Sequence, residues 1–225
     1  MSDRPFMSER QIVAMGGYPD DALLAYVLGL TRGRKVLCVA TASREDPGLT
    51  LALYERLHGR AEATHVDFFP WPPADLRQLV LEHDLILVTG GNTANALAIW
   101  RTHGFDLILR EAWEQGVLLT GWSAGMICWF EQAVTDSFGP DLAALDCLGF
   151  LRGSACPHYD GEELRRPVYT RLVSEGLAPG VAADDDVALH YVGEELREVV
   201  TSRPGATAYR VDAEGETPLE ARLVT

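Results

Sequence analysis

The chain has 225 residues, of which 47% are hydrophobic and 23% are charged. That composition is typical of a globular protein long enough to bury a substantial core, and it excludes disorder. The net charge of −14 argues against nucleic acid or an anionic membrane as a partner. No apolar stretch approaches the roughly 20 residues that cross a bilayer, and residues 1–10 lack the apolar core of a signal peptide. We therefore expect a cytoplasmic protein.

The first half of the chain alternates short apolar segments with segments of helical periodicity. The expected strands cover residues 11–17, 35–43, 64–70, 83–90 and 117–122. The expected helices between them cover residues 20–30, 48–58, 73–82, 93–103 and 107–115. This order predicts an α/β fold, a mostly parallel sheet with helices on both faces. Sites in such sheets form at the carboxyl ends of strands.

The regular alternation of strand-like and helical segments ends after residue 130. We expect strands over residues 133–136, 153–159, 188–192, 198–202 and 208–211. A helix is expected over residues 162–174, and a loop or brief helix over 141–148. The chain shows no low-complexity linker and no internal repeat, so we expect a single domain over residues 1–225.

The four cysteines are scattered and form no C-x-x-C pair: Cys38, Cys128, Cys147 and Cys156. Three of them lie in apolar surroundings. We therefore expect buried free thiols rather than disulfides or a zinc site.

The segment Gly116–Phe130 carries the strongest chemical signal. An apolar run meets Gly121-Trp-Ser-Ala-Gly125, and a second apolar run follows at once. This pattern predicts a buried strand that enters a helix through a tight turn, with Ser123 at the apex. The flanking glycines allow close packing, and the N–H groups of the new helix favour negative charge near the serine. Ser123 is therefore expected to be a nucleophile.

A serine hydroxyl needs a base that takes its proton, and that base needs a carboxylate to orient it. His158 ends an apolar segment after Pro157 and is the expected base. His190, on one face of an expected strand, is the weaker alternative. The remaining histidines are expected to be solvated surface residues: His58, His65, His83 and His103.

Two acids follow the serine. Asp136 leaves a short strand-like segment after the serine helix, and it is the expected orienting acid. Glu131, at the end of that helix, is the alternative, but a helix of that length would carry it about 12 Å from the helix start. A turn or cap role is the other interpretation of Asp136.

An oxyanion needs two N–H donors, and the first would be that of Ala124. The glycine-rich segment Gly90-Gly91-Asn92-Thr93 follows an apolar strand, starts a helix and is a candidate for the second. A plain tight turn and a phosphate cradle are the alternatives, although the phosphate motifs themselves are missing. The chemistry requires no metal and no organic cofactor.

Three linked motifs resemble the peptidase E (aspartyl dipeptidase) family, whose relatives include cyanophycinase. They are Thr89–Thr93, Gly121–Gly125 and Cys156–His158, in the family's order and spacing. The resemblance covers residues 11 to about 192.

The resemblance implies a fold similar to the class I glutamine amidotransferase domain, with the nucleophile on a strand-to-helix elbow. It implies a serine hydrolase in which Ser123 attacks, His158 is the base and an acidic residue after the serine helix orients it. The oxyanion donors of the family would fall on Gly91 and Ala124. The implied partner is a small peptide, and a homodimer is a further expectation for the family.

In the family, an N-terminal aspartate of the substrate is recognised by a basic residue downstream of the histidine. Arg165, Arg166 and Arg171 lie there, with surface ion pairing as their other interpretation. Peptidase E proper continues its elbow with a small residue and Asn, whereas residues 126–130 here are bulky and apolar. Dipeptides with an N-terminal Asp are thus one candidate substrate among short peptides.

Three alternatives remain open. A lipase-like or esterase-like hydrolase shares the Gly-x-Ser-x-Gly motif, but such enzymes place the acid and the histidine much farther along the chain from the serine. A cyanophycinase-like hydrolase is a second alternative. A catalytically silent binding protein is the third, because a fold does not guarantee a function. Glutamine amidotransferase chemistry is disfavoured because it uses Cys where this chain has Ser123.

Overall fold

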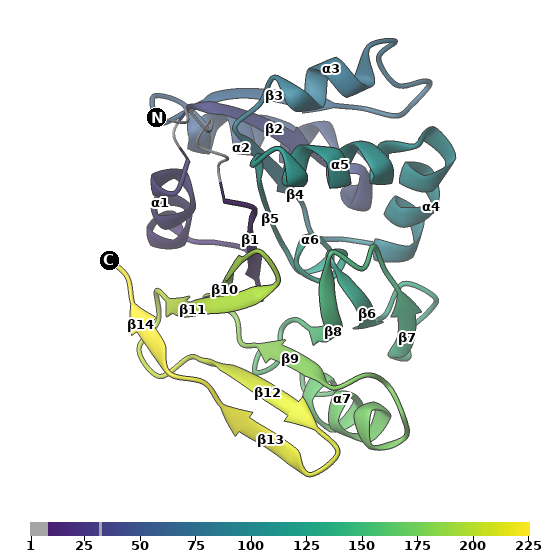
Figure 1. The fold of residues 1–225 in the computed structure, drawn as a ribbon, viewed down its shortest axis with the longest axis vertical. Helices are drawn as coiled ribbons and strands as arrows, with labels where there is room; N and C mark the ends of the chain where they lie inside the picture. Colours follow the sequence, from purple (N-terminus) through teal and green to yellow (C-terminus); the bar gives the residue numbers. More distant parts are fainter. Residues whose placement is uncertain (1–8, 32) are drawn as a thin grey trace, which may run out of the picture.

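Two β-sheets carry the fold in the computed structural model, which describes residues 9–31 and 33–225 (Figure 1). The first sheet has eight strands in the order β14-β11-β10-β1-β5-β4-β2-β3. Their bounds are β1 (Gln11–Met15), β2 (Lys35–Val39), β3 (Glu62–Val66), β4 (Leu85–Val88), β5 (Leu118–Trp122), β10 (Val187–Val192), β11 (Glu195–Thr201) and β14 (Ala221–Leu223). Strands β1, β5, β4, β2 and β3 are parallel, whereas β10 runs antiparallel to both its neighbours. The predicted parallel core is confirmed for this sheet.

Helices cover both faces of the first sheet, as predicted. Their bounds are α1 (Asp21–Gly29), α2 (Pro47–Leu57), α3 (Leu76–Leu81), α4 (Thr93–His103) and α5 (Phe105–Glu114). Alternate residues of one strand point to opposite faces. Val13 and Met15 of β1 therefore join the core with α1 and α2, while Ile12 and Ala14 join the core with α3, α4 and α5. This burial on both sides explains why the central strands are continuously apolar.

A second sheet is the main feature that the sequence pattern does not predict. It has the strand order β13-β12-β9-β8-β6-β7 and lies below the first sheet in Figure 1, together with α7 (Arg165–Ser174). Its strands are β6 (Phe130–Thr135), β7 (Ala143–Asp146), β8 (Leu151–Cys156), β9 (Gly180–Ala183), β12 (Ala208–Asp212) and β13 (Gly215–Pro218). Strands β6, β8 and β9 are parallel, and the other pairs are antiparallel.

The expected loop or brief helix over residues 141–148 is wrong, because β7 pairs with β6 there. The sequence analysis also misses β9, β13 and β14. These strands have only three or four residues each, and such short runs show too little periodicity to be recognised without their partners.

The helix after Ser123 is much shorter than the apolar run suggests. This helix, α6, covers only Ala124–Ile127, and the chain then enters β6. The bulky segment is buried in the core, with Trp129 and Phe130 no more than 1% exposed. Residues 126–130 therefore fill the space between the two sheets and their helices, and they do not line an open substrate pocket.

The four cysteines are free and buried, as predicted. Burial disfavours the thiolate and raises the pKa of Cys38, Cys147 and Cys156 to about 12. These thiols therefore pack as small apolar side chains.

The N-terminal segment for which we expect no signal peptide includes residues 1–8, which lie outside the described residues. Within residues 9–31 and 33–225, no helix has both the length and the apolar character needed to span a bilayer.

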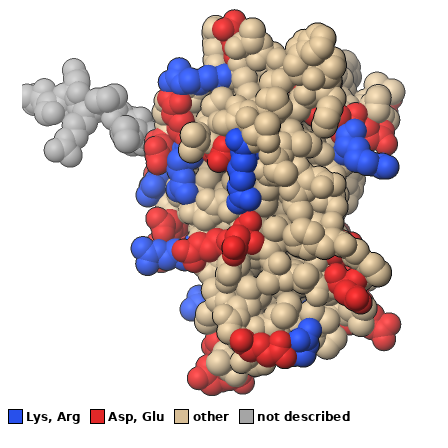
Figure 2. Space-filling model, turned by 90° about the vertical axis from the view of Figure 1, so that its right-hand side faces the viewer, with Lys and Arg blue, Asp and Glu red and all other residues tan. Residues whose placement is uncertain are grey.

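Charged side chains of both signs are interspersed on the face that lies at the right in Figure 1 (Figure 2). A broad area between them carries neither sign. On this face, the negative net charge of −14 is therefore not gathered into one acidic patch.

Replacing Gly125 tests the close contact between α6 and β4. A methyl group on Gly125 would lie 2.2 Å from the carbonyl oxygen of Val88, a backbone atom that cannot move aside. We expect Gly125→Ala to lower the free energy of unfolding by about 1–3 kcal/mol, measured by urea denaturation. Gly29→Ala, in α1 with no atom within 4 Å of the added methyl group, is the control. It should leave stability unchanged or raise it by up to about 1 kcal/mol. Equal stability of the two variants would contradict this packing.

Candidate active site

Ser123 occupies a strained turn between β5 and α6. Its backbone has φ 54° and ψ −109°, in a region that residues other than glycine rarely adopt. Ser123 is half-buried, while Trp122 and Ala124 on either side are buried. Its backbone N–H donates to the Met15 carbonyl at the end of β1, at 3.1 Å. The turn therefore presents the serine, and only the serine, to solvent at the carboxyl end of the sheet.

Small residues around the turn are required by sterics. A methyl group on Gly121 would lie 2.4 Å from the Val88 carbonyl oxygen of β4. One on Gly90 would lie 3.3 Å from the Cβ atom of Ser123 and 2.8 Å from Nε1 of Trp122. The turn and the Gly90 loop thus approach each other as closely as their backbones allow.

His158 reaches the same place from the second sheet. It follows β8 and Pro157, it has φ 52°, and its side chain is 20% exposed. Its backbone N–H donates to the Gly16 carbonyl at 3.3 Å. Successive carbonyls of the β1 end, those of Met15 and Gly16, therefore hold Ser123 and His158. These bonds anchor the backbones of the predicted nucleophile and base to adjacent residues at the end of β1.

The carboxylate beside His158 is that of Asp185. Oδ1 of Asp185 lies 2.7 Å from Nδ1 of His158. A methyl group on either Gly17 or Gly161 would lie 2.1 Å from one of the Asp185 carboxylate oxygens. The two glycines therefore leave the space that the carboxylate fills.

The structure corrects the expectation that Asp136 orients the histidine. The Asp136 carboxylate is 60% exposed and lies 3.7 Å from the guanidinium of Arg165. The alternative acid, Glu131, lies in β6 rather than at a helix end, and it accepts the N–H of Gly153 at 2.8 Å. Because α6 is a single turn, the chain enters β6 directly, so Glu131 lies within that strand and Asp136 immediately follows it.

The sequence pattern does not point to Asp185, because it does not predict the short strand that precedes this residue. It follows β9, and β9 pairs in parallel with β8 so that Ala182 faces Cys156. Both strands therefore end at the same edge, one next to His158 and the other next to Asp185. The available signal was the acidic run Asp184-Asp185-Asp186 directly after the short apolar segment Val-Ala-Ala.

His190, the alternative base, is a core residue. It is 5% exposed, and its two ring nitrogens lie 2.7 Å from the Tyr26 hydroxyl and 2.9 Å from the Gln11 side-chain oxygen. With both nitrogens engaged, this ring is not placed to accept a proton from a serine.

Among the other histidines, His58, His65 and His103 are exposed as predicted. The expectation for His83 is wrong. Its ring is buried between the Thr64 hydroxyl and the Leu79 carbonyl, at 2.6 Å from each.

The glycine-rich loop after β4 lies beside the serine. Gly91 has φ 126°, and a methyl group there would lie 2.2 Å from the Ala42 carbonyl oxygen. Within the described part of the chain, neither the Gly91 N–H nor the Ala124 N–H has a protein acceptor. Both donors remain available for a bound oxygen, which suits an oxyanion site.

The three arginines downstream of His158 are engaged in ion pairs. Arg165 is buried and pairs with Glu162 at 2.7 Å as well as with Asp136. Arg166 pairs with a glutamate of β13 at 3.2 Å, and Arg171 pairs with Glu175 one turn along α7. Ion pairing, the alternative interpretation, is therefore their observed role.

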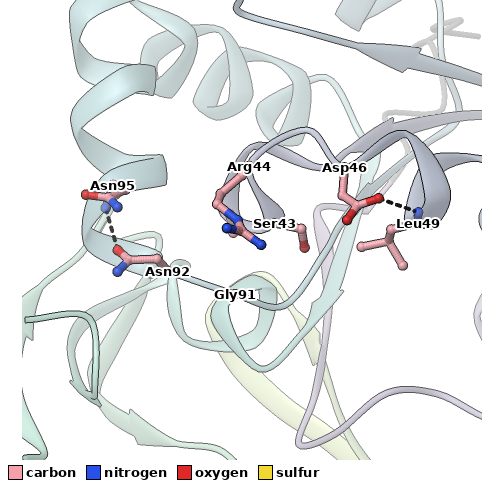
Figure 3. A pocket seen from close by; sticks show the side chains of 8 residues that line it. Ser43, Arg44, Asp46, Leu49, Gly91, Asn92 and Asn95 are labelled. Carbon is pink, nitrogen blue, oxygen red and sulfur yellow. Dashed lines mark hydrogen bonds between the residues drawn. The ribbon is translucent and has the colours of Figure 1, made fainter. Parts of the chain in front are cut away.

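A cavity of about 390 Å³ adjoins the Gly91 loop (Figure 3). Its polar and backbone lining comes from Ser43, Arg44, Asp46, Gly91, Asn92 and Asn95. Sequence reasoning singles out none of the first three. Ser43, Arg44 and Asp46 lie in the turn after β2. Because β2 is the neighbour of β4 in the first sheet, this turn lies next to the Gly91 loop that follows β4.

Comparisons with known proteins point to a family of peptidases. The family model described as Peptidase family S51 matches residues 15–199. The uncharacterized peptidase YgaJ of Bacillus subtilis is 46% identical over 212 residues, which cover 90% of this chain and 92% of that protein. Peptidase E of Shewanella denitrificans is 29% identical over 135 residues, which cover 56% of this chain and 57% of that protein. The crystal structure of a peptidase from an acI-B1 Actinobacterium superposes with a TM-score of 0.70 at 16% identity, covering 97% of each chain, and shows that the fold is shared.

The pH dependence of stability tests the burial of His190 beside Tyr26 and Gln11. Burial lowers the pKa of His190 from 6.5, so the folded state binds its proton less readily than the unfolded state does. Burial of the neutral His190 ring therefore contributes fully to the free energy of unfolding above pH 6.5, and this contribution is lost as the pH falls below 6.5. We expect the free energy of unfolding to fall more between pH 7.5 and pH 5.5 in the wild type than in His190→Gln, measured by urea denaturation at each pH. Identical pH dependence in the two proteins would contradict this assignment.

Proposed function

Because the chain belongs to peptidase family S51 and is therefore a peptidase, we propose that it hydrolyses short peptides through a Ser-His-Asp triad of Ser123, His158 and Asp185. The observation that carries the proposal is the convergence at the end of β1. There the strained serine and the histidine bind successive carbonyls, and the histidine contacts a carboxylate. The order and spacing of the motifs resemble the peptidase E family, and one of the matched relatives is named Peptidase E.

The proposed reaction begins with proton transfer. Asp185 accepts a hydrogen bond from Nδ1–H of His158, which leaves Nε2 to take the proton of the Ser123 hydroxyl. The serine oxygen attacks the peptide carbonyl, and the N–H groups of Gly91 and Ala124 stabilise the oxyanion. The histidine then gives its proton to the leaving amine. Water, activated by the same histidine, hydrolyses the acyl-enzyme and restores the serine.

An N-terminal Asp in the substrate remains a narrower proposal. The family resemblance supports it, but Arg165, Arg166 and Arg171 are already paired with carboxylates. A carboxylate on the substrate would have to be bound by a cation from another part of the site.

Two matched variants test the identity of the triad acid. We expect Asp185→Asn to lower kcat/KM for a cleaved peptide by about 10⁴-fold, because the histidine loses the carboxylate that sets its tautomer. Asp136→Asn removes only an exposed charge beside Arg165 and should keep activity within a few-fold. Steady-state kinetics of both variants decide the matter. A large loss in Asp136→Asn with little loss in Asp185→Asn would overturn the assignment.

A fluorophosphonate probe tests the nucleophile without any knowledge of the substrate. We expect stoichiometric labelling of the wild type at Ser123, read by mass spectrometry, and a sharply reduced rate in His158→Gln because the base is lost. Ser123→Ala should not be labelled at this position. His190→Gln is the control and should be labelled like the wild type. If the folded wild type is not labelled, the catalytically silent alternative is favoured.

A further inference from the structure

The side chain of Arg44 points into the cavity beside the proposed oxyanion loop. Figure 3 shows it between Ser43 and Asn92, directed toward Gly91. Within the described residues, its guanidinium forms no ion pair or hydrogen bond with a protein group. A guanidinium in a cavity with no partner of its own is available to bind an anion.

Its two acidic neighbours in the turn accept backbone N–H groups rather than a hydrogen bond from Arg44. The Glu45 carboxylate accepts the backbone N–H groups of Phe68 and Phe69, at 2.6 and 3.2 Å. Asp46 caps α2 by accepting the first N–H groups of that helix, at 2.7 and 3.2 Å. Among the described residues, neither acid forms an ion pair with Arg44, and Asp46 lines the same cavity.

The backbone conformation that places Arg44 in this cavity is energetically unfavourable. Arg44 has φ 60° and Glu45 has φ 54°, two successive left-handed residues that are not glycine. Their N–H groups bond back to the carbonyls of Thr41 and Ala40, at 3.1 and 2.9 Å. Unfavourable backbone conformations persist where the surrounding structure enforces them, and they cluster at ligand sites.

The turn that carries Arg44 is bonded to the loop that touches the serine. The Ser43 hydroxyl donates to the Gly90 carbonyl at 2.6 Å, and it lies 2.9 Å from the Thr89 hydroxyl. Gly90 in turn approaches the Cβ atom of Ser123. Hydrogen bonding and close packing through Gly90 therefore connect the turn that carries Arg44 to the turn that carries Ser123.

Arg44 also lines a second, mainly apolar cavity of about 410 Å³. Its lining includes Phe69, Ala98 and Ile99 together with Arg44 and Asn95. The arginine thus lines both cavities. This arrangement suits a peptide that offers a carboxylate beside an apolar side chain.

We propose that Arg44 binds a carboxylate of the peptide substrate in the cavity beside Gly91, and so selects short acidic or C-terminally free peptides. The proposal rests on Ser123 being the nucleophile only for the position of the scissile bond. Arg44 would be a substrate-binding residue with no part in proton transfer. The carboxylate has two possible sources, the side chain of an N-terminal Asp and the C-terminus of a dipeptide.

Four dipeptides separate these sources: Asp-Leu, Asn-Leu and the C-terminal amide of each. Their Kd values are measured by calorimetry on Ser123→Ala, which leaves the peptides intact. We expect at least a tenfold preference for the carboxylate in one comparison, Asp over Asn or acid over amide, as befits a charge-assisted hydrogen bond. Adding Arg44→Gln should reduce that preference to about one, and Arg44→Lys should keep part of it.

Arg171→Gln is the matched control, because it removes an exposed arginine that pairs with Glu175 at the C-terminal end of α7. It should keep the full preference. Arg44→Gly is a second variant that relieves the left-handed backbone, so it should raise the thermal midpoint while abolishing the preference. Its expected stability keeps the test valid if Arg44→Gln folds poorly.

Equal binding of all four dipeptides, binding of none, or a preference that survives in the Arg44 variants would overturn the proposal. Labelling of the wild type and of Arg44→Gln by the fluorophosphonate probe tests the nucleophile separately. Labelling with no Arg44-dependent preference contradicts the role of Arg44 alone. An Arg44-dependent preference without labelling contradicts the proposed serine chemistry and leaves a carboxylate-binding site.

Discussion

The arrangement of the site depends on two backbone hydrogen bonds at the end of β1. The Met15 carbonyl accepts the N–H of Ser123, and the Gly16 carbonyl accepts the N–H of His158. The serine arrives from the first sheet and the histidine from the second. Since β1 lies next to β5 in the centre of the first sheet, its end is a fixed point against which both turns are positioned. Without this shared edge, the two sheets would carry a serine and a histidine with no defined relation.

The site concentrates backbone strain that buried structure supports. Ser123, His158 and Arg44 all have positive φ, and such conformations cost on the order of 1–3 kcal/mol each. The supporting structure lies directly beneath, where β5 is buried throughout and the run after α6 fills the core. The bulky residues 126–130 directly after the turn are part of this buried support.

The proposed substrate recognition and the proposed catalysis use different parts of the chain. The proposed triad lies where β1, β5, β8 and β9 end, whereas Arg44 lies after β2 on the far side of the Gly91 loop. The arginines of α7, where the family resemblance places substrate recognition, stabilise the second sheet through ion pairs. In the proposed arrangement, the turn after β2 binds substrate and takes no part in proton transfer.

Local pattern was sufficient for the parallel strands, the helices, the elbow with Ser123, the Gly90-Gly91 loop and His158. Each of these depends on hydrophobic periodicity or on turn chemistry within a few residues, and such information is written directly in the sequence. The second sheet and the contact between His158 and Asp185 were decided only by the tertiary structure. Strand β9 is too short to be recognised alone, and its partner β8 lies some twenty residues earlier, beyond α7. Pairing between distant strands depends on hydrogen bonds and packing that no local window contains. For this reason the sequence predicts Asp136 as the orienting acid, whereas Asp185 contacts His158 in the structure.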